Sequence, residues 1–237
     1  MTTKLLLCGF LILTFFTGFS QLDQNIKSES AVKRLFDQKL QGSSKLYSGP
    51  EYIEQTYRMI GNQFFISDSL VNGWVSYGGH LYTDIPMQWD LLQDYVIIKS
   101  LRKEEKLVLR NDLIDSFYLS GHLVKNMEAD KNHNLLRAGF YDILYTNKTA
   151  VIAMRKKETL GIIQGVDVFY NFSAKDKIYV KKEGTYYLIN NKKDIVKLFS
   201  NKRAAIKRLV RKEGLNWRKN LDQCVVVAAQ YYDNFTH

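Results

Sequence analysis

The sequence predicts a mainly β protein of the α+β kind: an antiparallel sandwich, barrel or large curved sheet of about eleven strands, flanked by helices. Short apolar or aromatic runs, separated by Gly, Asn and Asp, recur between residues 46 and 189 at intervals of about 8–15 residues. Several of these runs are joined by pairs typical of tight hairpin turns, such as Gly78-Gly79 and Glu183-Gly184. Strands and helices do not alternate and no fixed period recurs, which argues against doubly wound, propeller and solenoid folds.

The first element, residues 1–20, has the pattern of a cleaved signal peptide. Lys4 precedes an apolar run over residues 5–16, and residues 17–20 place small side chains where a signal peptidase needs them, before Gln21. The run is shorter than the ~20 residues of a membrane span. We therefore expect an exported protein, periplasmic or associated with the outer membrane, with no transmembrane span after cleavage.

Three segments follow the signal peptide. Residues 21–42 are an expected N-terminal helical segment, because apolar residues recur there at spacings of three and four: Ala31, Val32, Leu35, Phe36 and Leu40. Residues 43–190 are the expected antiparallel β domain. Residues 191–237 are expected to form a basic helical segment packed on that domain, because its last helix carries one apolar stripe: Leu221, Val225, Ala228 and Tyr232.

The positive charge is unevenly distributed. The chain has a net charge of +10, and residues 175–219 alone hold 15 basic and 4 acidic residues. On the helix expected near residues 202–212, four cations lie away from the apolar face: Arg203, Lys207, Arg208 and Arg211. They predict docking to an anionic lipid, an acidic polysaccharide or an envelope protein. The alternative is a solvated outer face on a helix that packs against the sheet. Export, and the lack of RNA-binding or zinc-finger signatures, argue against a nucleic-acid partner.

Aromatic residues are densest between residues 73 and 90. Rings on a rigid hairpin can stack on sugar rings, which makes four of them candidate ligand-binding residues: Trp74, Tyr77, Tyr82 and Trp89. The alternative is that they form the core of the first β layer, because aromatic side chains suit half-buried pleated surfaces.

Catalytic and metal-binding patterns are absent from the sequence. His and Cys residues do not occur at metal-ligand spacings, and the nucleophile elbow and the phosphate loop are missing. We therefore expect no metal and no cofactor. Cys224 lies in an apolar helical run, as a buried structural thiol does. Asp84, Asp90 and Asp94 offer a carboxylate pair for glycoside hydrolysis, although aspartates between strands are commonly turn formers.

Short motifs spread over most of the chain carry a resemblance to a known group of proteins. They occupy residues 46–52, 60–65, 79–86, 89–90, 94–98, 193–194, 211–212, 217–219 and 228–233. With these motifs the chain resembles a family of uncharacterised exported proteins of Bacteroidota. The resemblance implies a location and supplies neither an activity nor catalytic residues.

Together these observations predict an exported, non-enzymatic envelope or periplasmic protein that binds a partner or ligand. Two alternatives remain open from the sequence: a glycan-directed hydrolase that uses Asp84, Asp90 or Asp94, and a purely structural component of the envelope.

Overall fold

The computed structural model describes residues 45–54, 59–101, 104–129, 135–164 and 167–235. The chain divides into two compact units, Met1–Ser48 and Gly49–His237, and the description below concerns the second. The expected signal peptide (residues 1–20) and N-terminal helical segment (residues 21–42) lie outside the described residues.

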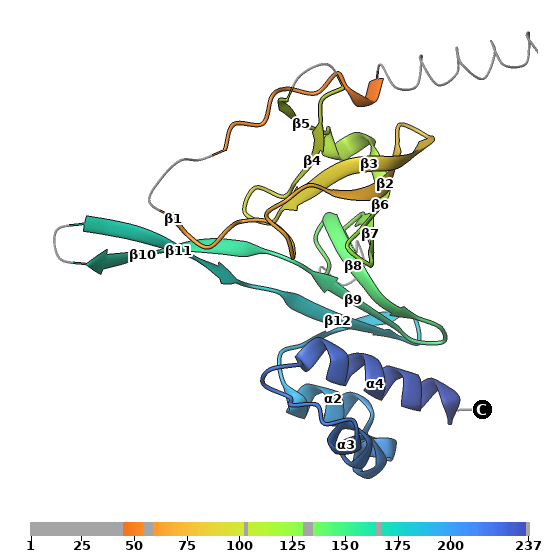
Figure 1. The fold of residues 1–237 in the computed structure, drawn as a ribbon. Helices are drawn as coiled ribbons and strands as arrows, with labels where there is room; N and C mark the ends of the chain where they lie inside the picture. The colour runs from red at the N-terminus through yellow and green to blue at the C-terminus, as the bar shows by residue number, and fades with distance from the viewer. Residues whose placement is uncertain (1–44, 55–58, 102–103, 130–134, 165–166, 236–237) are drawn as a thin grey trace, which may run out of the picture. The chain divides into compact units, whose positions relative to one another are not determined.

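A ten-stranded antiparallel sheet forms the main layer, in the order β13-β12-β9-β8-β7-β6-β2-β3-β4-β5 (Figure 1). Its edges are β5 and β13, so the sheet is open. The predicted antiparallel β architecture is confirmed in its large-sheet form. The strands are β2 (Val71–Tyr77), β3 (His80–Asp90), β4 (Tyr95–Lys99), β5 (Lys106–Val108), β6 (Ile114–Leu119), β7 (His122–Met127), β8 (Gly139–Thr146), β9 (Ala150–Met154), β12 (Lys177–Lys182) and β13 (Thr185–Ile189).

Two-residue turns set the register of the hairpins. Gly78 and Gly79 link β2 to β3 with φ of 56° and 79°, and Glu183 and Gly184 link β12 to β13 with φ of 50° and 81°. Positive φ at both central residues gives the turn a twist that matches the flanking strands. Both turns are where the sequence predicts them.

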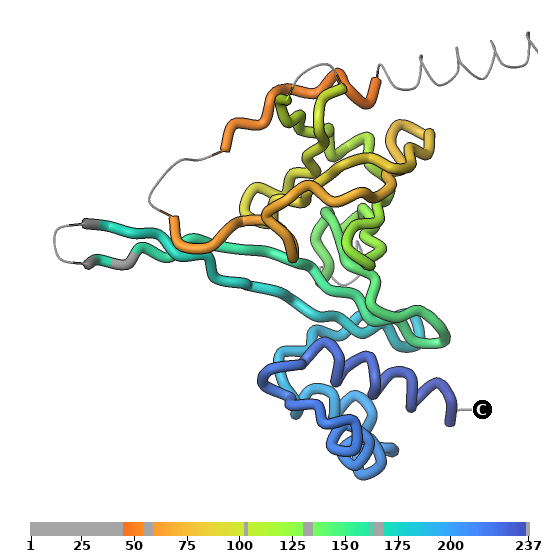
Figure 2. The backbone as a smooth tube through the Cα atoms, in the orientation of Figure 1, coloured from red at the N-terminus to blue at the C-terminus, as the bar shows by residue number. Residues whose placement is uncertain are grey.

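A second, three-stranded sheet has the order β1-β11-β10, with β1 (Met59–Ile60), β10 (Lys157–Gln164) and β11 (Asp167–Ala174). Only Arg155 and Lys156 separate β9 from β10, and only residues 175–176 separate β11 from β12. One long antiparallel ribbon therefore passes from the large sheet into the small one, as the tube in Figure 2 shows.

The C-terminal segment contains α2 (Lys192–Leu198), the 3₁₀ turn η2 (Ser200–Lys202), α3 (Arg203–Lys212) and α4 (Leu221–Asn234). Helix α4 packs on β8, β9 and β12. The shared core includes Val151 and Val180 of the sheet, and Phe199 and Val225 of the helical segment, all fully buried. Of the predicted α4 stripe, Val225, Ala228 and Tyr232 are buried. Among the described helices, none is long and apolar enough to cross a membrane.

Candidate anion-binding groove

The position of α2 is set by its N-terminal cap. The side-chain oxygen of Asn191 accepts a hydrogen bond from the backbone N–H of Lys193 at 2.7 Å. In return, the Asp194 carboxylate accepts from the backbone N–H of Asn191 at 3.1 Å. This reciprocal capping box satisfies backbone donors that a helix start leaves without partners. Asp194, the one acid of α2, therefore serves the cap and does not line the groove described next.

A groove of about 340 Å³ runs along α2, η2 and α3. Five of its seven lining residues are cations and none is acidic: Lys192, Lys193, Val196, Lys197, Ser200, Arg203 and Lys207. We call these five cations the groove cations. The segments on both sides of the groove are held by buried side chains of their inner faces, Ile195, Phe199, Ile206 and Val210. The groove is therefore a consequence of how α2 and α3 pack on the core.

The groove cations are exposed and have no ion-pair partner among the described residues. Lys192 alone has another close contact, with its Nζ 5.8 Å from the centre of the Trp217 ring. Lys193 and Lys197 are four residues apart on α2, as are Arg203 and Lys207 on α3. Like charges at that spacing destabilise a helix by about 0.2–0.5 kcal/mol per pair. An anion in the groove would remove this repulsion.

The structure divides the four predicted docking residues into two groups. Arg203 and Lys207 line the groove, whereas Arg208 and Arg211 are exposed but do not line it. Arg211 lies one turn beyond Lys207 on the same side of α3 as Arg203 and Lys207. Arg208 and Lys212, which are also four residues apart, lie on a different side. The α2 lysines were not among the residues predicted from the sequence. Their spacing and the charge count of residues 175–219 were the available signals.

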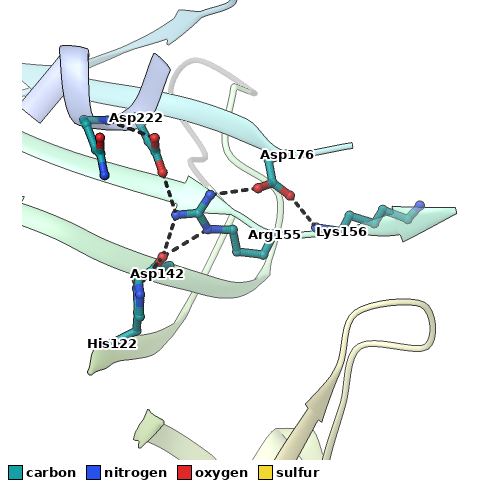
Figure 3. Close-up of polar contacts among 7 residues, drawn as sticks. His122, Asp142, Arg155, Lys156, Asp176 and Asp222 are labelled. Atoms are coloured by element: carbon teal, nitrogen blue, oxygen red, sulfur yellow. Dashed lines mark hydrogen bonds and ion pairs between the residues drawn. The ribbon is translucent and has the colours of Figure 1, made fainter. Parts of the chain in front are cut away.

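Helix α4 is fastened to the sheets by a buried ion cluster around Arg155 (Figure 3). The Arg155 guanidinium donates to Asp142 at 2.8 and 3.0 Å and to Asp176 at 2.7 Å. It also forms a 3.4 Å ion pair with Asp222 of α4. On the other side of Asp142, the Nδ1 of His122 lies 3.0 Å from each carboxylate oxygen. The cluster thus joins β7, β8, the base of the β10–β11 hairpin and α4.

Burial and charge act in opposite directions on Arg155. Its side chain is 10 % exposed and that of Asp142 is fully buried. Burial lowers the pKa of Arg155, but the hydrogen bond to Asp176 and the charge of Asp142 raise it more, so the net shift is upward. The guanidinium therefore stays charged. Because its partners occupy its donors, this cluster serves as a structural anchor.

A second anchor lies at the C-terminal end of α4. Asp233 is buried, and its Oδ2 accepts hydrogen bonds from the N–H and hydroxyl of Thr149, both at 3.0 Å, and from the hydroxyl of Tyr145 at 3.1 Å. These contacts tie the end of α4 to the β8–β9 hairpin. Helix α4, which α2 and α3 contact, is consequently fixed to the sheet at both ends.

The structure does not bring the four candidate aromatic residues together. Tyr77 and Trp89 are 2 % and 0 % exposed and belong to the core, as the alternative interpretation holds. Trp74 and Tyr82 are half-buried. Trp74 stacks on Tyr118 with ring centres 6.2 Å apart, on the strand face opposite Tyr77.

Of the three candidate carboxylates, Asp84 lies apart, whereas Asp90 and Asp94 are neighbours at the β3–β4 turn. Asp84 and Asp90 are six residues apart on β3, about 20 Å, whereas a glycosidase pair needs about 5–10 Å. Asp90 is fully buried and accepts hydrogen bonds from Tyr52 and two backbone amides. Asp94 accepts from the Trp89 indole at 3.0 Å, and burial raises its pKa. Asp90 and Asp94 thus hold the β3–β4 turn.

Among the described residues, no three His, Cys, Asp or Glu side chains are grouped as a metal site requires. Cys224 is buried in α4, and burial raises the pKa of its thiol, which keeps it protonated.

No family model, no curated protein and no solved structure matches the chain. The function of the chain is therefore inferred from its geometry, in which the groove between α2 and α3 gathers five cations and no acid.

Proposed function

We propose that this protein is an exported, non-enzymatic component of the cell envelope that binds a linear acidic polysaccharide in the groove between α2 and α3. One observation carries the binding part: the groove cations come from two helices and line one groove that contains no acid. The location rests on the signal-peptide pattern of residues 1–20 and on the resemblance to exported proteins of Bacteroidota.

The burial of the apolar side chains favours a polysaccharide over a lipid. An amphipathic helix binds a bilayer by burying its apolar face among the acyl chains. In α3 that face is already occupied, because Ile206 and Val210 are 0 % and 1 % exposed in the protein core. A polymer chain also fits into a groove, whereas a flat membrane surface does not.

The chemistry of the lining fits a carboxylate- or sulfate-bearing sugar chain. Four of the five groove cations are lysines, whose compact ammonium groups attract anions without the planar, two-point geometry that arginine favours. Val196 and Ser200 add an aliphatic contact and a hydroxyl beside the cations. Such a site selects for charge spacing along a polymer and not for one small anion.

The experiment compares two double variants that remove the same charge from the same helix. Arg203→Gln/Lys207→Gln removes both cations that α3 contributes to the groove. Arg208→Gln/Lys212→Gln is the matched control, because it removes two cations outside the groove. We expect the groove variant to lose affinity for polygalacturonate by about tenfold or more, because each cation near an anionic surface contributes about 1 kcal/mol. The control should change little.

The same proteins are tested on neutral dextran and on vesicles that contain phosphatidylglycerol. Binding to dextran should be absent, and binding to polygalacturonate should weaken as salt rises. Equal loss in the two double variants would contradict a groove site, because it would show attraction by net charge alone. Strong binding to the vesicles without binding to polygalacturonate would show that the partner is a membrane and not a polysaccharide.

A further inference from the structure

The β10–β11 hairpin leaves one long strand edge open. In the described part of the chain, β10 is the terminal strand of the small sheet and pairs with β11 alone. The β5 edge of the large sheet is different, because Tyr52 N–H donates to Lys106 at 2.8 Å and Val108 N–H donates to Pro50 at 2.9 Å. An open edge carries backbone donors and acceptors ready to pair with another strand.

Two hydrogen bonds at the base of the hairpin show which backbone groups face outward. Lys156 O accepts from Lys175 N–H at 2.8 Å, towards β11, whereas Lys157 N–H donates to Leu91 O at 3.0 Å, away from β11. Orientation alternates along a strand in an antiparallel pair. The N–H and C=O groups at positions 159, 161 and 163 therefore point to the open edge.

Exposed apolar side chains surround this edge. Leu160 is 51 % and Ile163 is 77 % exposed on β10, and Val168 and Tyr170 are 45 % and 38 % exposed on β11. Ile163 pairs directly with Val168, and Gly161 with Tyr170, so these residues share one face of the hairpin. Of these side chains, Leu160 and Ile163 lie on the edge strand itself, where the side chains of a paired strand would cover them in part.

The composition of β10 points to a second copy as the occupant. The positive surplus of the chain lies in residues 175–219, whereas residues 159–164 contain no charged residue and no proline, the features that commonly protect a strand edge from pairing. A two-fold axis places such an edge antiparallel to itself, which makes it self-complementary.

We propose that the protein forms a two-fold dimer in which β10 pairs antiparallel with β10 of a second copy, with the axis at Gly161. In this register Thr159 lies opposite Ile163 of the other copy, and Gly161 lies opposite its own counterpart. Each of the three residue pairs formed by positions 159, 161 and 163 exchanges two backbone hydrogen bonds, about six in total. Lys157, whose N–H is already bonded to Leu91, stays outside the pairing. The two small sheets join into one continuous sheet.

The register is tested by cross-linking. In a directly hydrogen-bonded antiparallel pair the Cα atoms are about 5.5 Å apart, within disulfide range. A Cβ at Gly161 meets nothing closer than 3.7 Å, so Gly161→Cys fits the fold. Under mild oxidation we expect this variant to give a disulfide-linked dimer. Its neighbour on β11 provides the matched control, because in Tyr170→Cys the two thiols are separated by two further strand spacings and should not cross-link.

The association is tested by sedimentation at concentrations up to about 100 µM, a range suited to a small interface. The unmodified protein should reach twice the chain mass. Thr159→Lys/Ile163→Lys places like charges directly opposite each other in the proposed register and should return it to a monomer. Val168→Lys/Tyr170→Lys adds the same charge on the adjacent strand and should dimerise nearly as well. A monomer throughout, equal cross-linking of both cysteine variants, or a dimer insensitive to the β10 lysines would overturn the proposal.

Discussion

The sheet and the helical segment use charged side chains in opposite ways. In the sheet, Asp142 and Arg155 are buried and bonded to several partners each. Along the groove the cations are exposed, close to one another and without acidic partners among the described residues. Buried, satisfied charges hold a fold together, whereas a cluster of unpaired like charges opposes stability. The comparison indicates which polar groups build this protein and which are available to a ligand.

The largest effect is expected from a core aromatic residue. Trp89→Ala removes a fully buried ring that contacts Phe65, Phe117 and Phe140, and it also removes the indole bond to Asp94. We expect a loss of about 3–5 kcal/mol in the free energy of unfolding. Chemical denaturation measures it.

Trp74→Ala is the comparison variant for this measurement. Trp74 is half-buried and stacks on Tyr118, so its loss should reduce stability by about 1 kcal/mol. Equal losses in the two tryptophan variants would contradict the assignment of Trp89 to the core and Trp74 to the surface.

The next effect separates buried from exposed ion pairs. Asp142→Ala deprives Arg155 and His122 of a shared partner, and loss of one member of a buried pair costs about 3–5 kcal/mol. The exposed pair of Arg110 and Asp112 is the control, and Asp112→Ala should leave the thermal midpoint nearly unchanged. If both variants melt alike, the Arg155 cluster is not an anchor.

Asp94→Asn should stabilise the protein in a pH-dependent manner. Burial raises the pKa of Asp94 above 3.8, so the folded state disfavours its charged form. The ionised carboxylate therefore lowers stability above the folded pKa, and the effect vanishes below 3.8, where both states are protonated. Asn also tolerates the φ of 59° at this position.

The expected result is a higher thermal midpoint for Asp94→Asn near pH 7 and a gain that shrinks as the pH falls towards 4. A gain of the same size at both pH values would show that the effect does not come from the charge.

The smallest effect concerns the groove without ligand. Arg203→Gln/Lys207→Gln removes two like-charge pairs on α3, Arg203 with Lys207 and Lys207 with Arg211, and should raise the free energy of unfolding by about 0.4–1 kcal/mol at low salt. The gain should fade as salt screens the repulsion. A loss of stability would show that these side chains support the fold.

Local patterns predicted much of this architecture. The hairpin turns at Gly78-Gly79 and Glu183-Gly184 follow from backbone preferences of two residues, and the α4 stripe follows from helical spacing. The small sheet did not follow from the sequence, because β1 pairs in parallel with β11 over more than a hundred residues of chain. Pairings at that distance leave no local pattern.

The groove was half predictable for a related reason. Arg203 and Lys207 stand out on one amphipathic helix, but their proximity to the α2 lysines depends on how two helices pack. Likewise, the aromatic stretch alternates between the two faces of its strand, but the sequence does not show which face points into the core. The packing of the folded protein buries Tyr77 in the core and leaves Trp74 half-buried on the opposite face.

Acetylation footprinting of lysines, with and without polygalacturonate, locates the ligand on the native protein. We expect Lys193, Lys197 and Lys207 to become protected when the polysaccharide binds, since all three line the groove. Lys212 and Lys219 are exposed outside the groove and should react as before. Protection spread evenly over all five lysines, or confined to Lys212 and Lys219, would contradict a binding site between α2 and α3.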